Sequence, residues 1–253
     1  MTRLASLSLV ALGLLSCGST GGGLISLPLR AGGVDRDRAA PLVFTSPQGW
    51  TIALSTGLIA LGPFYCNASP PRTDTFRSGL VLVQATGQLV VDVLDPALHE
   101  LPRGADGETG RAVSVEIGLL PADQSQPAEA RDRLAGDVGL IEGTATRAGV
   151  TVRFAGPIAI DASLATPQTP LASLTRIKGA SADLSFSGGP QALELRVDPA
   201  GWFDGVDFGD LLLNPPRADG TYSWTVKSTF ASALAQGVKR ETGVYLFTLV
   251  PGS

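Results

Sequence analysis

The chain has few of the side chains on which most metal-binding and hydrolytic sites depend. Its 253 residues include one His, one Met and two Cys. A single imidazole excludes sites that need two His ligands, such as HExxH zinc sites and most His-rich copper sites. The 19 basic residues do not outnumber the 23 acidic ones, and the net charge is -4. The chain therefore lacks the excess of positive charge that is typical of nucleic-acid-binding proteins. We therefore expect no nucleic-acid partner.

The sequence also lacks the common motifs of nucleotide binding and nucleophilic catalysis. It contains no GxxxxGK loop, no GxGxxG after a strand pattern and no GxSxG nucleophile elbow. These gaps predict a protein that is not an enzyme. A hydrolase built on a pair of carboxylates stays open as an alternative, because sequence separation does not say which acidic groups converge.

The N-terminus has the layout of a secretory signal peptide. Arg3 supplies a positive start, and an apolar run follows from Leu4 to Leu15. About twelve residues at roughly 1.5 Å each span roughly 18 Å, which is short of the roughly 30 Å hydrocarbon core of a membrane. We therefore predict a signal peptide over residues 1–16 and no transmembrane helix there.

The quartet Leu14-Leu15-Ser16-Cys17 resembles the lipobox of bacterial lipoproteins. The resemblance implies that the Cys17 thiol receives a diacylglyceryl group and that the signal is cut before this residue. Gly18 would then direct the protein to the outer membrane, at its periplasmic or its surface-exposed side. Residues 17–23 become the lipidated cysteine and a Gly-rich tether, and an ordinary signal peptide is the alternative. The stretch Gly49–Tyr65 resembles uncharacterised envelope lipoproteins of GC-rich Gram-negative bacteria.

The remaining chain, residues 24–253, has the hydrophobic pattern of β-strands. Apolar residues alternate with polar ones over Val113–Leu119, Val150–Phe154 and Tyr222–Val226. A hairpin is expected where two alternating segments flank the turn Ser187–Pro190. About ten to twelve strand-like segments predict an all-β fold with a single β-sandwich or jelly-roll-like domain.

Continuous apolar runs and helix-like segments are fewer. The runs at Leu80–Val83, Leu89–Leu94 and Val244–Val250 predict central strands covered on both faces. Short helices are expected over Pro127–Leu134 and Phe230–Lys239. We therefore expect one or two short helices in the domain.

The most suggestive segment for binding runs from Asp198 to Asp210 and combines four acids with aromatic residues and glycines. Oxygen ligands on a tight loop suit Ca²⁺, although the spacing is not that of an EF-hand. An aromatic ring beside carboxylates also suits a sugar, with the ring as a stacking platform. The simplest interpretation is that the aromatic residues pin the loop to the core. The candidate ligand residues are Asp198, Trp202, Asp204, Asp207 and Asp210.

Two further residues form a weaker metal hypothesis. Cys66 closes an apolar segment, and a buried, inert thiol is its simplest state. His99 lies in a stretch that looks like a surface turn. The two residues hold a metal only if the fold brings them together with carboxylates.

These observations together predict a lipid-anchored cell-envelope protein that acts as a non-enzymatic binding or assembly module. Its expected partners are the membrane, through the lipid anchor, and envelope proteins or glycans. A Ca²⁺- or metal-binding envelope protein is the alternative, and no cofactor other than Ca²⁺ is suggested.

Overall fold

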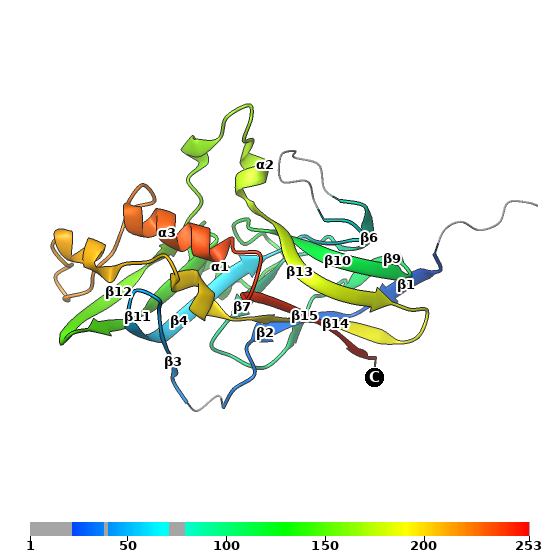
Figure 1. Cartoon of the computed structure of the whole chain (residues 1–253), viewed down its shortest axis with the longest axis horizontal. Helices are drawn as coiled ribbons and strands as arrows, with labels where there is room; N and C mark the ends of the chain where they lie inside the picture. Colours follow the sequence, from blue (N-terminus) through cyan, green and yellow to red (C-terminus); the bar gives the residue numbers. More distant parts are fainter. Residues whose placement is uncertain (1–21, 38–39, 71–78, 253) are drawn as a thin grey trace, which may run out of the picture.

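The computed structural model describes residues 22–37, 40–70 and 79–252. This part of the chain forms fifteen strands in three sheets, with a few short helices (Figure 1). The predicted all-β, sandwich-like fold is thus confirmed. Cys17 and the proposed signal peptide lie outside the described residues.

The largest sheet has six antiparallel strands and carries the N-terminal end of the described chain. Its order is β1-β9-β6-β5-β10-β13. The strands are β1 (Leu24–Leu27), β9 (Ala105–Glu108), β6 (Val81–Ala85), β5 (Phe64–Asn67), β10 (Gly110–Gly118) and β13 (Arg176–Phe186).

A five-stranded and a four-stranded sheet complete the fold. In the five-stranded sheet, the two halves of the long β4 pair with different neighbours. Its strands are β12 (Val150–Ile158), β11 (Gly139–Arg147), β4 (Thr51–Leu61), β3 (Leu42–Thr45) and β7 (Leu89–Asp92). The four-stranded sheet contains β15 (Tyr245–Pro251), β14 (Gln191–Val197), β2 (Leu29–Gly33) and β8 (His99–Glu100).

The helices are short and cover the sheets. The two predicted helices are confirmed as α1 (Ala128–Leu134) and α3 (Thr229–Val238). Ser228 caps α3 by accepting a hydrogen bond from the Ala231 amide, which satisfies one of the free N–H groups of the first turn. Four short pieces were not predicted: η1 (Ala162–Leu164), α2 (Leu171–Leu174), η2 (Pro199–Phe203) and η3 (Phe208–Leu213).

One continuous hydrophobic core joins the sheets. It contains buried residues from Leu27 near the start to Tyr245 near the end, together with the aromatic residues of η2 and η3. A close-packed core of this extent holds the short connecting helices in place. No helix in residues 22–37, 40–70 or 79–252 is both long and apolar enough to cross a membrane.

The predicted hairpin around Ser187–Pro190 is wrong in its pairing. Both strands form, but β13 pairs with β10, whereas β14 pairs with β15 and β2. The Gln191 side chain closes the turn, because it accepts from the Ser187 amide at 2.8 Å and donates to the Ser185 carbonyl at 3.3 Å. The turn therefore carries the chain from one sheet to the next.

Three other strand predictions need correction. Tyr222–Val226 is no strand, because only Tyr222 forms an isolated bridge, to Phe154. The run at Val244–Val250 forms the edge strand β15 and keeps partly exposed residues. Leu80 and Val81 are exposed, so the run that leads into β6 is not covered on both faces. Apolar composition alone did not distinguish an edge or one-sided strand from a central one.

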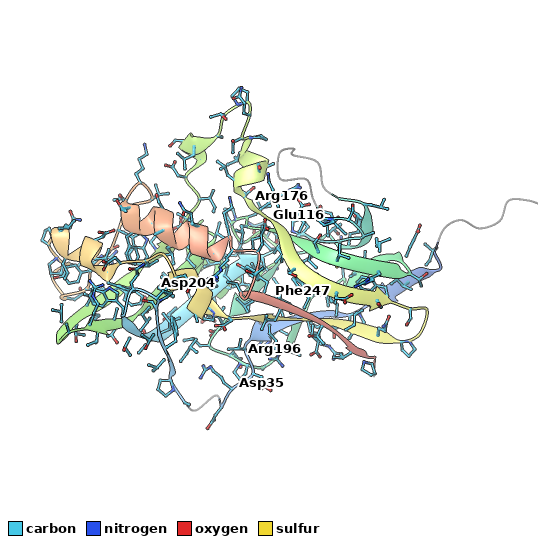
Figure 2. All side chains as sticks on the ribbon, in the orientation of Figure 1. Asp35, Glu116, Arg176, Arg196, Asp204 and Phe247 are labelled. Carbon is cyan, nitrogen blue, oxygen red and sulfur yellow. The ribbon has the colours of Figure 1, made fainter. Side chains whose placement is uncertain are left out.

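The alternating pattern of β10 does not predict the burial of its acidic residue. Glu116 takes a polar position in the alternation over Val113–Leu119, yet it is only 2% exposed. Its carboxylate forms an ion pair with Arg176 of the adjacent strand β13 (Figure 2). Because this neighbour supplies the opposite charge, the buried position tolerates a carboxylate.

Candidate functional site

The segment from Asp198 to Asp210 contains the 3₁₀ helix η2 and the first turn of the 3₁₀ helix η3. An aspartate directly precedes each of these helices. Asp198 caps η2 by accepting from the Ala200 amide at 2.9 Å. Asp207 caps η3 by accepting from the Gly209 amide at 2.8 Å. These local hydrogen bonds are what aspartate side chains favour where a chain turns. Two of the predicted ligand residues therefore shape the backbone.

Asp207 also links the segment to the five-stranded sheet. One of its oxygens, Oδ1, accepts from Trp50 Nε1 at 2.9 Å and from Arg147 Nη2 at 3.2 Å. The Arg147 guanidinium in turn lies 4.3 Å from the centroid of the Trp50 ring, where a cation–π contact is favourable. The Gly209 hydrogen bond, followed by Trp50 and Arg147, holds the pKa of Asp207 below its usual value. Oδ1 of this carboxylate thus has three donors within the fold.

Asp204, which is labelled in Figure 2, ends η2. It forms an ion pair with Arg240, just beyond α3. Both side chains are partly exposed, so the pair contributes modestly to stability. It fastens η2 to the end of α3, which also packs against it.

The aromatic residues of the segment are buried. Trp202, Phe203 and Phe208 are fully buried, and Phe208 lies 4.8 Å from Phe154 between ring centroids. Phe208 also meets Phe230 at 5.3 Å. Trp202 therefore offers no face to a ligand, and the expectation that it forms a stacking platform is corrected. The interpretation that these rings pin the loop to the core agrees with the burial.

The four acids do not come together around one point. No group of three or more His, Cys, Asp or Glu side chains with metal-binding geometry occurs in the part of the chain that the structure describes. Asp198, Asp204 and Asp207 each face a different protein partner. Four carboxylates that are close in sequence therefore do not form one metal-binding cluster in the described residues.

Asp210 differs from the other three, because it lines an open pocket of about 580 Å³. Its apolar lining comes from Leu211, Leu213, Trp224 and Phe230, and the three buried residues Leu211, Trp224 and Phe230 form its floor. Trp224 is 8% exposed and donates from Nε1 to the Pro157 carbonyl at 2.9 Å, which fixes the ring. The polar rim consists of Asp210, Asn214, Ser223, Thr225, Lys227, Ser228 and Thr229. We call this site the η3–α3 pocket.

The volume and lining of the η3–α3 pocket suit a small ligand. Binding sites for small molecules are typically about 300–1,000 Å³ with an apolar lining and a few polar groups that set orientation. Asp210 offers an acceptor, Lys227 a cationic donor, and Asn214 both a donor and an acceptor. The pocket can therefore hold a molecule that has an apolar face and several hydroxyl or amide groups.

Sequence reasoning found Asp210 but missed the rest of this pocket. Tyr222–Val226 was interpreted as a strand because apolar and polar residues alternate there. The same alternation arises in an irregular segment that buries Trp224 and leaves Ser223 and Thr225 at the rim. The nearby Pro215 and Pro216, which interrupt regular pairing, were the available signal.

His99 and Cys66 lie in different sheets and different environments. His99 is exposed in β8, and its Nε2 lies 3.3 Å from Asp95 Oδ2. Cys66 is buried in β5, and desolvation raises the pKa of its thiol to about 12. A buried thiol with such a pKa stays protonated and inert. The condition for the weaker metal hypothesis, convergence of the two residues with carboxylates, is therefore not met.

Family models, curated proteins and solved structures were compared with the chain, and none of them matches it.

Proposed function

We propose that this chain is a lipid-anchored protein of the bacterial cell envelope whose folded part is a non-enzymatic binding module. Cys17 carries the lipid, and the outer membrane is the proposed location. The observation that carries the binding role is the η3–α3 pocket, where a polar rim surrounds an apolar floor.

The surface around β1 supports the anchor. Leu24 is 87% exposed, and the exposed Leu80 and Val81 lie with it along a groove of about 870 Å³ between β1, β6 and β9. Leu24 lies seven positions after Cys17. Extended chain covers at most roughly 3.6 Å per residue, so Leu24 at the groove lies within roughly 25 Å of Cys17. Exposed leucines at this distance favour contact with the bilayer surface.

The position of the η3–α3 pocket also supports the proposal. In Figure 1, β1 lies at one end of the molecule, and the yellow to orange segment that contains η3 lies toward the other end, near the β11–β12 hairpin. A pocket distant from the anchored end keeps access to solvent when the other end is held at a membrane.

The chemistry of the rim favours a small hydroxylated ligand such as a monosaccharide. The Asp210 carboxylate accepts from hydroxyl groups, and Lys227 and Asn214 donate to ring or hydroxyl oxygens. The apolar floor suits the C–H face of a sugar ring. Glycans of the envelope are therefore the partners that we propose.

The anchor is tested by metabolic labelling with a clickable palmitate analogue, followed by membrane fractionation. We expect the wild-type chain to be labelled and membrane-bound, and Cys17→Ala to lose the label. Cys66→Ala is the matched control, because it removes the other thiol and should keep the label. A labelled Cys17→Ala chain would overturn the anchor.

Ligand binding is tested by NMR titration of the purified chain with glucose and N-acetylglucosamine. We expect shifts at the amides of Asp210 and Trp224, and an affinity loss of about tenfold in Asp210→Asn because a charge-assisted hydrogen bond contributes roughly 1.5–3 kcal/mol. Asp106→Asn, an exposed change in β9, is the control. If neither sugar shifts these amides, the proposed ligand class is wrong.

A further inference from the structure

A second, smaller cavity lies between α3 and the segment that contains η1 and α2. Its volume is about 250 Å³. Figure 1 shows the η1–α2 segment projecting from the body of the molecule above α3. We call this cavity the α2–α3 cavity. Its apolar lining comes mainly from Ile160, Leu164, Leu174, Val226, Ala231 and Ala235.

Helix α3 contributes to the core with one side and to the cavity with another. Phe230, Leu234 and Val238 follow one another at intervals of four residues and are buried in the core. Ala231 and Ala235, which are also four residues apart, line the cavity. Because these two positions carry only methyl groups, α3 leaves space between itself and the η1–α2 segment.

The polar part of the lining carries one acid and one base. Its members are Asp161, Ser232, Gln236 and Lys239, so the formal charges cancel. Asp161 caps η1 through Oδ1, which accepts from the Ser163 amide at 2.9 Å and from the Ser163 hydroxyl at 2.6 Å. Its other oxygen, Oδ2, accepts no hydrogen bond in the described part of the chain. This oxygen is open to a donor group of a ligand.

We propose that the α2–α3 cavity binds an uncharged aliphatic alcohol, with its hydroxyl group at Asp161 and its chain against Leu164, Leu174 and Ala235. The chain gains free energy when it leaves water for this apolar wall. A carboxylate on the ligand would be repelled by Asp161, and an ammonium group by Lys239, because both residues line the same small cavity. A hydroxyl group donates to the Asp161 carboxylate and costs less to desolvate than an ion.

The volume of the cavity sets the size of the alcohol. An engineered apolar cavity of roughly 150 Å³ holds benzene, and sites for drug-sized ligands occupy roughly 300–1,000 Å³. The α2–α3 cavity lies between these two sizes, which favours a chain of about six to eight carbon atoms. The site is separate from the η3–α3 pocket, because the two share no lining residue.

The test compares three probes that share one chain and differ in charge. At pH 7, 1-hexanol is uncharged, hexanoate carries a carboxylate and hexylamine carries an ammonium group. NMR titration of the purified full chain should show 1-hexanol shifting the amides of Ala231 and Ala235. We expect 1-hexanol to bind at least about tenfold more tightly than either charged probe, because each charged probe is desolvated beside a like charge.

Two variants that each remove one charge test the balance of the lining. Asp161→Asn leaves only the base and should tighten hexanoate binding by about fivefold. Lys239→Gln leaves only the acid and should tighten hexylamine binding by a similar factor. Both should bind 1-hexanol within about twofold of the wild type, because an oxygen acceptor stays at residue 161. Asp106→Asn, an exposed change in β9, is the control and should change none of the three affinities.

A variant that fills the cavity tests the apolar part. Ala235→Leu should weaken 1-hexanol binding by about tenfold or more, because the larger side chain takes space from the ligand. Ala162→Leu adds the same side chain at an exposed position of η1 outside the lining. This matched control should bind 1-hexanol like the wild type.

Three results would overturn the proposal. In the first, 1-hexanol shifts no amide of the cavity, or shifts those of Asp210 and Trp224 and thus binds in the η3–α3 pocket. In the second, a charged probe binds the wild type as tightly as 1-hexanol. In the third, folded Ala235→Leu binds 1-hexanol like the wild type. The proposed function does not depend on these results, because it is tested with sugars and with Cys17→Ala.

Discussion

From Asp198 to Asp207 every charged side chain has a partner within the fold, whereas from Asp210 to Phe230 polar side chains surround an open pocket. Asp198 and Asp207 cap the two 3₁₀ helices, and Asp204 pairs with Arg240. Asp210, three residues after Asp207, lines the η3–α3 pocket with Lys227. The first stretch fastens the chain to the core, and the second leaves polar groups available to a ligand.

The difference shows that a run of acids is not one functional unit. Buried aromatic residues fix the first stretch, so that its carboxylates are directed toward neighbouring backbone and basic groups. At the end of η3 the chain leaves the core, since Leu213 is 82% exposed. Side chains in the second stretch therefore face solvent on one side. Three substitutions test this division.

The largest expected effect belongs to Phe208, which anchors the first stretch. Its ring meets those of Phe154, Trp50 and Phe230 at centroid distances of 4.8, 5.5 and 5.3 Å. Phe208→Ala should lower the free energy of unfolding by about 3–5 kcal/mol, because it leaves a cavity in a close-packed aromatic cluster. Chemical denaturation measures this change.

Leu213→Ala is the matched control, because it also removes an apolar side chain from η3 but at an exposed position. Its effect should stay within about 0.5 kcal/mol. Equal losses in the two variants would contradict the division between a buried and an open stretch.

An intermediate effect is expected at Asp207. Asp207→Ala removes a helix cap and the acceptor of Trp50 and Arg147, and we expect a loss of about 1–2 kcal/mol at pH 7, a value kept low because the side chain is partly exposed. The pKa of Asp207 is lowered in the folded state. Its contribution is therefore fully present above the unfolded pKa of about 3.9 and is lost as the pH falls through the folded pKa.

Denaturation of wild type and Asp207→Ala between pH 7 and pH 2 follows this change. The two stability curves should converge at the acidic end. Asp106→Ala, which removes an exposed aspartate from β9, is the control and should change the free energy of unfolding at pH 7 by less than about 0.5 kcal/mol. A gap between wild type and Asp207→Ala that stays constant with pH would show that the charge of Asp207 does not contribute.

The smallest effect on stability is expected at Asp210. Its side chain lines the η3–α3 pocket and begins no helix. Asp210→Asn should change the free energy of unfolding by less than about 0.5 kcal/mol, although it should weaken sugar binding. Differential scanning calorimetry measures the stability of the same sample that is used for the titration. A loss as large as that of Asp207→Ala would make Asp210 a structural residue like its neighbours.

The sequence predicted local structure better than pairing. Short-range patterns predicted the helices α1 and α3 and strands such as β12. The spacing of apolar residues in one helix or strand depends only on the sequence of that element. The pairing of β13 with β10 depends on a strand that is distant in sequence, so the turn at Ser187–Pro190 was misinterpreted as a hairpin. Burial of Glu116 depends in the same way on Arg176, a charge supplied from another strand.

The candidate site was predicted only in part for the same reason. Asp210 was found because acids and aromatic residues stand out in a run, but Trp224 and Lys227 belong to the pocket through folding alone. The aromatic Trp202 was assigned to a ligand, whereas its surroundings bury it. The residue type alone does not tell whether an aromatic ring lies in the core or lines a pocket.

By itself, the sequence determined the scarcity of His and Cys, the signal-like N-terminus with Cys17, and the all-β character of the chain. These properties depend on composition or on neighbours within a few residues. Only the tertiary structure decided which carboxylates are engaged and where the η3–α3 pocket lies. These features depend on contacts between distant segments, which the packing of three sheets and α3 brings together.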